Sequence, residues 1–331
     1  MRLSPQRTQR VKNYLPTVAL VIPAVIFAGC RQKQKSVASQ PYASSPITQN
    51  SPQAAPPLPP QTPLNYESDP VYQQAQSLSR SDIRKAMEVL EAAVSKAPDD
   101  PRSAPYYLQL GRLKKEYENY QNYGAATPEL GEKQKNEYFE YAKARPSEYF
   151  YNEIGDDYFY VGTHFKELEK RFPLSPLAAD AGYEITNLSQ GGECEGFVLC
   201  YIEGAFAPVH AFLLRYPDTP HTAEAAQRAD DAFRKALWGD QWKTDLGDIK
   251  DPTKSTDYYD PRELKKLVDE YEELAEKLPQ KFRARIWETA AYYREKLGEK
   301  DKSRTLYERI ATQFPGYENI KEIRQKLNTP R

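Results

Sequence analysis

The stretch RFPLSPLAADA, from Arg171 to Ala181, predicts how this chain folds, because a close copy of it, RYPDTPHTAEA, begins 44 residues later at Arg215. Five of the eleven positions are identical in the two copies, and three more carry similar residues (Phe/Tyr, Ser/Thr and Asp/Glu). An internal repeat of this kind is typical of a protein built from stacked copies of one structural unit.

Each copy contains the end of one helix and the start of the next. An apolar helical pattern runs into an aromatic residue followed by proline, which lacks an N–H group and clashes with the preceding helical turn. Two residues later Ser175 or Thr219 can cap a new helix, and Pro176 or Pro220 suits its first position. We therefore expect a joint between stacked helical hairpins at each copy, with helices that begin at Pro176 and Pro220.

A related pattern lies near the end of the chain, in WETAAYYREKLGEKDKSRTLYERIATQFP. It resembles the tetratricopeptide repeat, in which Trp287 and Ala291 would lie on the first helix, Gly298 at the turn, Tyr307 on the second helix and Pro315 at the close. The resemblance implies an all-α fold, a right-handed solenoid of about five to six stacked hairpins with loop insertions. We expect this repeat domain over residues 70–331.

Local helix signals agree with that fold. Asp260, Pro261 and Glu263 form a cap, a first-position proline and an acidic first turn, and an apolar face then runs to Pro279. We find no convincing alternating run that would predict a β-strand.

The first thirty residues have a different composition. A basic segment precedes an apolar stretch from Leu15 to Gly29, which is short for a membrane span and typical of a secretory signal. Phe27-Ala28-Gly29-Cys30 resembles the bacterial lipobox, whose cysteine receives a diacylglycerol anchor. This implies a signal peptide over residues 1–29 and lipidation at Cys30, while a plain signal peptide or an uncleaved anchor are the alternatives.

The segment that follows is rich in Pro, Ser, Gln and Ala, as in SPQAAPPLPPQTP. It has no apolar period, so burial cannot offset the entropy lost on ordering. We expect residues 30–69 to be a lipidated, disordered tether that holds the folded body away from a membrane.

Two cysteines, Cys194 and Cys200, lie in the glycine-rich insertion SQGGECEGFVLC. In an oxidising compartment such a close pair indicates a structural disulfide. Free thiols or a redox-active pair are the alternative, although redox pairs usually have Cys-x-x-Cys spacing. A second insertion spans Gly239–Tyr259, and a third lies near Asn122–Gly131.

Composition limits the chemistry that we expect. The chain has 46 basic and 47 acidic residues, which argues against a nucleic-acid-binding protein. His164, His210 and His221 are the only histidines, none at ligand spacing, so we expect no metal site and no cofactor. Phosphate-binding loops and nucleophile motifs are absent from the sequence, and we expect the protein not to be an enzyme.

The segment 137–162, EYFEYAKARPSEYFYNEIGDDYFYVG, carries many of the chain's 25 tyrosines. Tyrosine is amphipathic and frequent in interfaces, and it also fills helical-repeat cores. We favour a role in the core over a ligand platform, and we expect Gly155-Asp156-Asp157 to form a turn.

Lipobox, proline-rich tether and repeated joints together resemble the outer-membrane β-barrel assembly lipoproteins and the periplasmic coordinator proteins. The resemblance implies a protein of the bacterial envelope, anchored by its lipid to the outer membrane and facing the periplasm. Three hypotheses follow: a scaffold for a protein or peptide partner, a small-molecule or glycan receptor that uses residues 137–162, and an enzyme such as a cell-wall hydrolase. The scaffold is the one we favour.

In a tetratricopeptide solenoid the first helix of each hairpin lines the concave face, which is the usual binding face. One face of the expected first helices gives a row that is mixed in charge and leans acidic, for a partner with basic and apolar side chains. The expected partner-binding residues are Asp180, Glu184, Asn187, Glu224, Arg228, Asp231, Arg285, Glu288 and Tyr292.

Overall fold

The computed structural model describes residues 65–121, 128–153, 155–188, 198–237, 251–256 and 259–328. All of them belong to one compact unit that spans Pro59–Arg331. Within these residues the chain forms twelve α-helices and a single two-stranded sheet. The prediction of a mainly α-helical protein is therefore confirmed.

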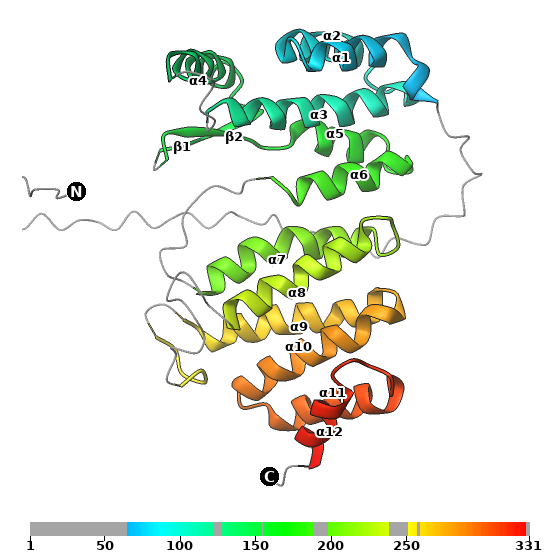
Figure 1. The fold of residues 1–331 in the computed structure, drawn as a ribbon, viewed down its shortest axis with the longest axis vertical. Helices are drawn as coiled ribbons and strands as arrows, with labels where there is room; N and C mark the ends of the chain where they lie inside the picture. The colour runs from blue at the N-terminus through cyan, green and yellow to red at the C-terminus, as the bar shows by residue number, and fades with distance from the viewer. Residues whose placement is uncertain are drawn as a thin grey trace, which may run out of the picture. The chain divides into compact units, whose positions relative to one another are not determined.

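Apart from α4, which lies at the level of α1 and α2, the helices follow one another in chain order (Figure 1). Short 3-10 turns precede α1, α3, α4 and α10. The α-helices are α1 (Pro70–Ser79), α2 (Ile83–Lys96), α3 (Ala104–Glu118), α4 (Pro128–Lys143), α5 (Thr163–Arg171), α6 (Pro176–Ile185), α7 (Val198–Arg215), α8 (Thr222–Leu237), α9 (Pro261–Lys277), α10 (Arg283–Lys296), α11 (Lys300–Gln313) and α12 (Ile320–Asn328).

Helices joined by a short connection pack more closely than helices separated by a long one. The repeated joints connect helices that lie directly against each other, α5 with α6 and α7 with α8. Helices separated by a long insertion, α6 and α7, contact each other less. Each joint is a short turn between two helices that pack directly against each other. Some alternate helices also touch, α3 with α5, α7 with α9 and α8 with α10.

Two clusters of buried side chains form the core. The first lies among α1–α6 and the sheet, and the second among α7–α12 together with Tyr183 of α6. Tyr216, between α7 and α8, packs against both clusters. Its hydroxyl donates to Glu169 Oε1 of α5 at 2.8 Å, so a polar contact reinforces this apolar junction.

The first joint has the predicted cap. Ser175 has an extended backbone, and its hydroxyl accepts the N–H of Leu177 at 3.2 Å, while Pro176 is the first residue of α6. The second joint differs, because α8 begins at Thr222 and not at Pro220. The Thr219 N–H donates to Thr222 Oγ1 at 2.8 Å, so these residues form a turn in which the side chain of Thr222 takes up the donor.

The prediction of no β-structure was wrong. Strands β1 (Tyr149–Asn152) and β2 (Asp157–Tyr160) pair in antiparallel register, with Tyr149 opposite Tyr160. Aromatic residues occupy both faces of this hairpin, so the alternation of polar and apolar residues that would reveal strands is missing. Of the expected turn Gly155-Asp156-Asp157, the first two residues join the strands, with a φ of 50° at Asp156, whereas Asp157 is the first residue of β2.

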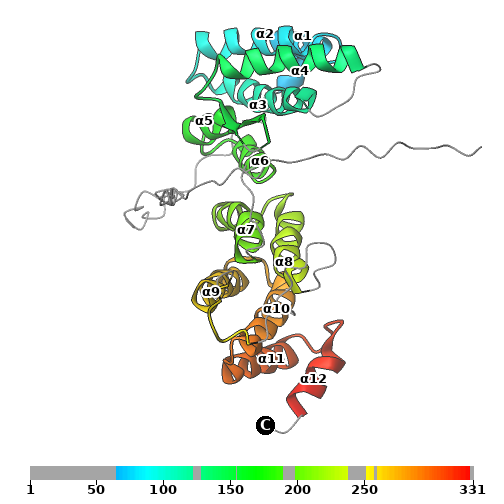
Figure 2. The same ribbon diagram turned by 90° about the vertical axis from the view of Figure 1, so that its left-hand side faces the viewer.

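The hairpin and α4 form an insertion between α3 and α5. Tyr138 of α4 lies 5.3 Å from Tyr117 of α3, ring centroid to ring centroid, and the Tyr141 hydroxyl bonds to Glu91 of α2 at 3.3 Å. This α4 therefore packs against α2 and α3 (Figure 2). The chain returns to α5 at Gly162, where a φ of 77° favours glycine.

The pattern that begins at Trp287 is placed as predicted. Trp287 and Ala291 are buried on α10, and Tyr307 is buried on α11. Gly298 forms the turn between these helices with a φ of 77°, a conformation that side chains with a Cβ disfavour.

Candidate binding surface

The expected partner-binding residues lie on α6, α8 and α10, three alternate helices of the fold. We call this set the polar row. Its members on α6 are Asp180 and Glu184, with Asn187 two residues beyond the helix; those on α8 are Glu224, Arg228 and Asp231; those on α10 are Arg285, Glu288 and Tyr292.

Arg228 connects α8 to the end of α6. Its guanidinium donates to Asn187 Oδ1 at 2.6 Å, to Thr186 Oγ1 at 2.7 Å and to the Thr186 carbonyl oxygen at 2.7 Å. The carbonyl groups at a helix C-terminus lack partners within the helix and attract cations. Arg228 therefore closes the end of α6 and joins two of the three groups of the row.

The other residues of α6 also bond to neighbouring elements. Asp180 Oδ1 lies 2.7 Å from His221 Nε2, and the His221 ring stacks on Tyr183 with centroids 4.3 Å apart. Glu184 Oε1 accepts from Arg112 Nε of α3 at 2.7 Å. The row thus continues onto α3 at one end.

A buried carboxylate, Asp230, joins α8 to α9 and α10. Only 1 % of Asp230 is exposed, and it accepts from Tyr271 at 2.9 Å, Thr289 at 2.7 Å and Arg285 Nε at 2.6 Å. Arg234 Nε forms a further ion pair with Asp230 at 2.7 Å. A buried charge is tolerated only when it is paired and hydrogen-bonded, as here. Asp230 consequently fixes the position of Arg285 in the row.

Glu288 has a similar role at the end of the chain. Its carboxylate accepts from the Tyr317 hydroxyl at 2.8 Å and from Asn319 Nδ2 at 3.0 Å, and it pairs with Arg234 at 3.3 Å. Burial and the bond to Glu288 raise the pKa of Tyr317 well above its usual value. Glu288 therefore holds the segment before α12 against α8 and α10.

The three remaining members of the row are less constrained. Asp231 accepts from Gln227 of its own helix at 2.7 Å. Burial raises the pKa of the Tyr183 hydroxyl, and the nearby Glu224 carboxylate adds to this rise. Neither carboxylate forms an ion pair within the part of the chain that the structure describes. Tyr292 lies under the ammonium groups of Lys296 and Lys326, at 5.5 and 5.8 Å from its ring centroid.

A series of bonds therefore connects the residues of the polar row from α3 to α12. Most of these side chains bond to a neighbouring helix and so stabilise the packing of the helices. Sequence reasoning missed the residues that make these bonds, above all Asp230, Arg234 and Arg112. A signal for Asp230 exists: it lies among Ala226, Ala229 and Phe233 on the buried face of α8, where an unpaired acid would not be tolerated.

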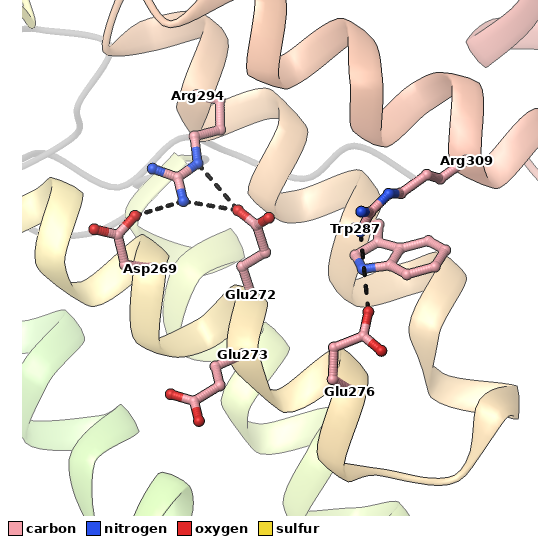
Figure 3. Close-up of a pocket in the computed structure, with 7 residues that line it drawn as sticks. All are labelled: Asp269, Glu272, Glu273, Glu276, Trp287, Arg294 and Arg309. Atoms are coloured by element: carbon pink, nitrogen blue, oxygen red, sulfur yellow. Dashed lines mark hydrogen bonds and ion pairs between the residues drawn. The ribbon is translucent and has the colours of Figure 1, made fainter.

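A second feature is a pocket of about 250 Å³ between α9, α10 and α11. Figure 3 shows its lining: Asp269, Glu272, Glu273, Glu276, Trp287, Arg294 and Arg309. Arg294 is 4 % exposed and pairs with Asp269 at 2.5 Å, Glu272 at 2.7 Å and Glu299 at 2.8 Å. Burial by itself would lower the pKa of Arg294, but these three carboxylates raise it instead.

The other groups of this pocket are also paired. Glu276 lies 3.9 Å from Arg309, whose guanidinium covers the Trp287 ring at 5.5 Å, and Trp287 itself is 2 % exposed. Glu273 lies 3.7 Å from Lys277. The side chains that line the pocket thus form ion pairs that connect α9 to α10 and α11. The Trp287 ring is covered and offers no face to a ligand.

The histidines occupy three separate environments. His164 on α5 bonds to the Tyr160 hydroxyl at 2.9 Å, and burial, with a contribution from the Lys114 ammonium, lowers the pKa of His164 to about 3. Burial also lowers the pKa of His210 on α7. His221, expected on a helix, lies in the turn just before α8. No cluster of three or more metal-ligating side chains occurs among the described residues.

The tyrosine-rich segment contributes mainly to the core. Tyr138, Tyr141, Tyr149 and Tyr160 are all buried, which favours the core interpretation for these four side chains. Phe150 and Tyr151 on β1 are exceptions, 48 % and 40 % exposed. The ligand-platform alternative would have to rely on these exposed rings and not on the segment as a whole.

Some predictions fall outside the described residues. Cys30 and the whole of segment 1–64 do so, as does Cys194; Cys200 lies in the first turn of α7. The lipid anchor and the disulfide therefore stay predictions. Among the described helices, none has the length and apolar character needed to cross a membrane.

Comparison with known proteins gives no assignment. Neither a known protein family nor a curated protein matches this chain by sequence.

Proposed function

We propose that this protein is a lipid-anchored scaffold outside the cytoplasm, which binds a protein or peptide partner along the polar row and serves outer-membrane or cell-envelope assembly. The observation that carries the proposal is the polar row itself, in which alternate helices present half-exposed polar side chains that continue from α3 through α6 and α8 to α10. We propose no catalytic function.

The arrangement of helices supports a repeat solenoid of the tetratricopeptide type. Stacked helical repeats have contacts between alternate helices, joints of similar sequence and a final helix that covers the last pair, as α12 does here. In such folds the surface of one row is continuous, so an extended or helical peptide can contact several repeats at once.

The bonds within the row identify the residues most available to a partner. Glu184 is bound to Arg112, and Arg285 and Glu288 are bound to α8, so replacing them would disturb the fold as well as binding. Glu224 and Asp231 form no ion pair with any described residue, although Arg228 lies one helical turn from each. A partner with basic side chains would gain most from these two carboxylates.

Site-specific photo-crosslinking in the native host tests the proposal. A photoreactive residue at Glu224 or at Asp231 should capture the same partner, whereas one at the exposed Lys266 on α9 should not. The double variant Glu224→Lys/Asp231→Lys should reduce capture while the melting temperature stays nearly unchanged, since exposed charge changes usually cost within about 0.5 kcal/mol. If capture survives this variant but is lost when the Gly239–Tyr259 insertion is shortened, the partner binds the insertion and the proposed surface is wrong.

The anchor has a separate test. Radioactive palmitate should label the wild-type chain and not the Cys30→Ala variant, and only the wild type should fractionate with membranes. An unlabelled wild type in a bacterial host would exclude the lipoprotein assignment and leave the polar row untouched.

A further inference from the structure

A pocket of about 470 Å³ lies between α1 and α3, the first and third helices of the fold. Four lining residues, Gln76, Ser77, Ser79 and Arg80, come from the second half of α1 and its end. Gln109 of α3 completes it. This Gln109 is three residues before Arg112, so the two share a face of α3, and the pocket lies where the polar row continues beyond Glu184.

Arg80, Gln76 and Gln109 differ from the residues of the row because their side chains have no partner among the described residues. Arg80 and Gln76 are exposed to solvent, and Gln109 is half-buried. Arg80 forms no ion pair, and the side-chain amides of Gln76 and Gln109 form no hydrogen bond, with any residue that the structure describes. Arg112, Arg228 and Arg285, by contrast, each bind an oxygen of a neighbouring helix at 2.6 or 2.7 Å. The exposed guanidinium of Arg80 can therefore be reached by a ligand from solvent.

The donors of the pocket define the chemistry of that ligand. Arginine presents N–H groups in a planar fork that matches a carboxylate, and each glutamine amide adds two more N–H donors. The two serine hydroxyls already donate to helix carbonyl oxygens, Ser77 to Gln74 and Ser79 to Gln76, each at 2.8 Å. The lining includes no Asp or Glu, so its charge is positive.

We propose that this pocket binds a carboxylate of the partner, with Arg80 as the pairing cation and Gln76 and Gln109 as additional donors. The inference rests on the proposed scaffold function and adds a direction to it. The α1–α3 end of the surface would take an acidic group, and Glu224 and Asp231 on α8 would take basic ones. A bound peptide would therefore lie in one orientation only.

Nuclear magnetic resonance on the full chain, labelled with nitrogen-15 at arginine and glutamine, tests this with defined probes. The peptide acetyl-Gly-Glu-Gly-amide should cause saturable shifts of the Arg80 Nε–H and of the Gln76 and Gln109 side-chain amides. The neutral peptide acetyl-Gly-Gln-Gly-amide should not. A third peptide, acetyl-Gly-Gly-Gly with a free carboxylate, distinguishes an acidic side chain from a chain terminus as the source of the carboxylate; either one, if saturable, supports the proposal.

Variants make the test specific. Arg80→Gln should weaken the affinity for the acidic peptide about tenfold or more, the loss expected for one charge-assisted bond. Arg80→Lys, which keeps the charge and loses the fork, should weaken it less. Arg324→Gln, an exposed arginine on α12 with no ion pair among the described residues, is the matched control and should leave binding unchanged.

Equal shifts in the Arg80→Gln variant, equal shifts with the neutral peptide, or shifts that never saturate would each overturn the pocket assignment. The outcome is separable from that of the scaffold proposal. If photo-crosslinking at Glu224 and Asp231 captures a partner equally in wild type and in Arg80→Gln, the scaffold function stands and the carboxylate pocket is wrong. If the probe binds but no crosslink forms on α8, the pocket stands and the polar row is wrong.

Discussion

Replacing Asp230 with alanine should destabilise the protein strongly, because this carboxylate is the common acceptor for three helices. The variant leaves the hydroxyls of Tyr271 and Thr289 without a partner in positions that are 1 % and 3 % exposed, respectively. Each buried polar group without a partner costs about 1–3 kcal/mol. Arg285 and Arg234 are 38 % and 21 % exposed in their side chains, so water replaces part of what they lose.

We therefore expect a loss of about 3–5 kcal/mol, the range for breaking a buried ion pair on one side. For a domain of this size, 1 kcal/mol shifts the melting temperature by about 2–4 °C, which gives a decrease of about 6–20 °C. Asp230→Asn keeps the shape and one acceptor oxygen, so it should lose about half as much.

Circular dichroism during thermal and urea unfolding measures the effect. The neighbouring Asp231→Ala is the matched control, since Asp231 bonds only to Gln227 on its own helix, and it should change stability within about 0.5 kcal/mol. Equal melting temperatures for the Asp230 and Asp231 variants would refute the reasoning, because the carboxylate would then contribute no more than an exposed one.

Three further predictions follow from buried groups and from the cysteines. Folding lowers the pKa of His164 to about 3, so below about pH 6.5 the unfolded chain binds a proton at His164 that the folded protein does not. The free energy of unfolding of the wild type should therefore fall by about 2 kcal/mol between pH 6.5 and pH 5. In the His164→Gln variant this decrease should be smaller. Burial raises the pKa of Glu118, so the folded protein loses stability as the pH rises through that pKa and the carboxyl group ionises. The Glu118→Gln variant should therefore have a higher melting temperature than the wild type at pH 7 and the same melting temperature at pH 4. A lower melting temperature of the variant at pH 7 would contradict this. Cys194 and Cys200 should resist alkylation without reductant, as read by intact mass, and two alkylated cysteines in the folded protein would exclude the disulfide.

The helices could be predicted from the sequence wherever the cue is local. Ser175 and Pro176 at the start of α6, and Asp260 and Pro261 at the start of α9, have the caps that their residue types predict, since a cap depends on two or three neighbouring residues. The start of α8 lies two residues after the predicted position. The Thr219 N–H donates to the side chain of Thr222, so Thr219 and Pro220 belong to a turn before the helix, and their residue types alone do not reveal this.

The β-hairpin and the bonds within the polar row could not be predicted in this way. Strand prediction relies on a contrast between two faces, and Tyr149, Phe150 and Tyr151 offer none, although the first is buried and the other two are exposed. Asp230 meets Tyr271 and Thr289 across separations of 41 and 59 residues, which only the packing of helices establishes. The residue types of the row were therefore predictable, but the partners that hold them were not.

The junction between the two core clusters has a consequence for cooperativity. Stacked repeats unfold together only when the interface between neighbours is strong enough to couple them. Here α6 and α7 contact each other little. The coupling depends on the aromatic side chains of Tyr183 and Tyr216 and on polar bonds such as those of Arg228 and His221. Amide hydrogen exchange should then report two protection levels, one for each cluster. A ligand that contacts α3 and α8 at the same time would stabilise the junction between the two clusters by its binding free energy. Its binding should therefore slow hydrogen exchange at amides that it does not contact.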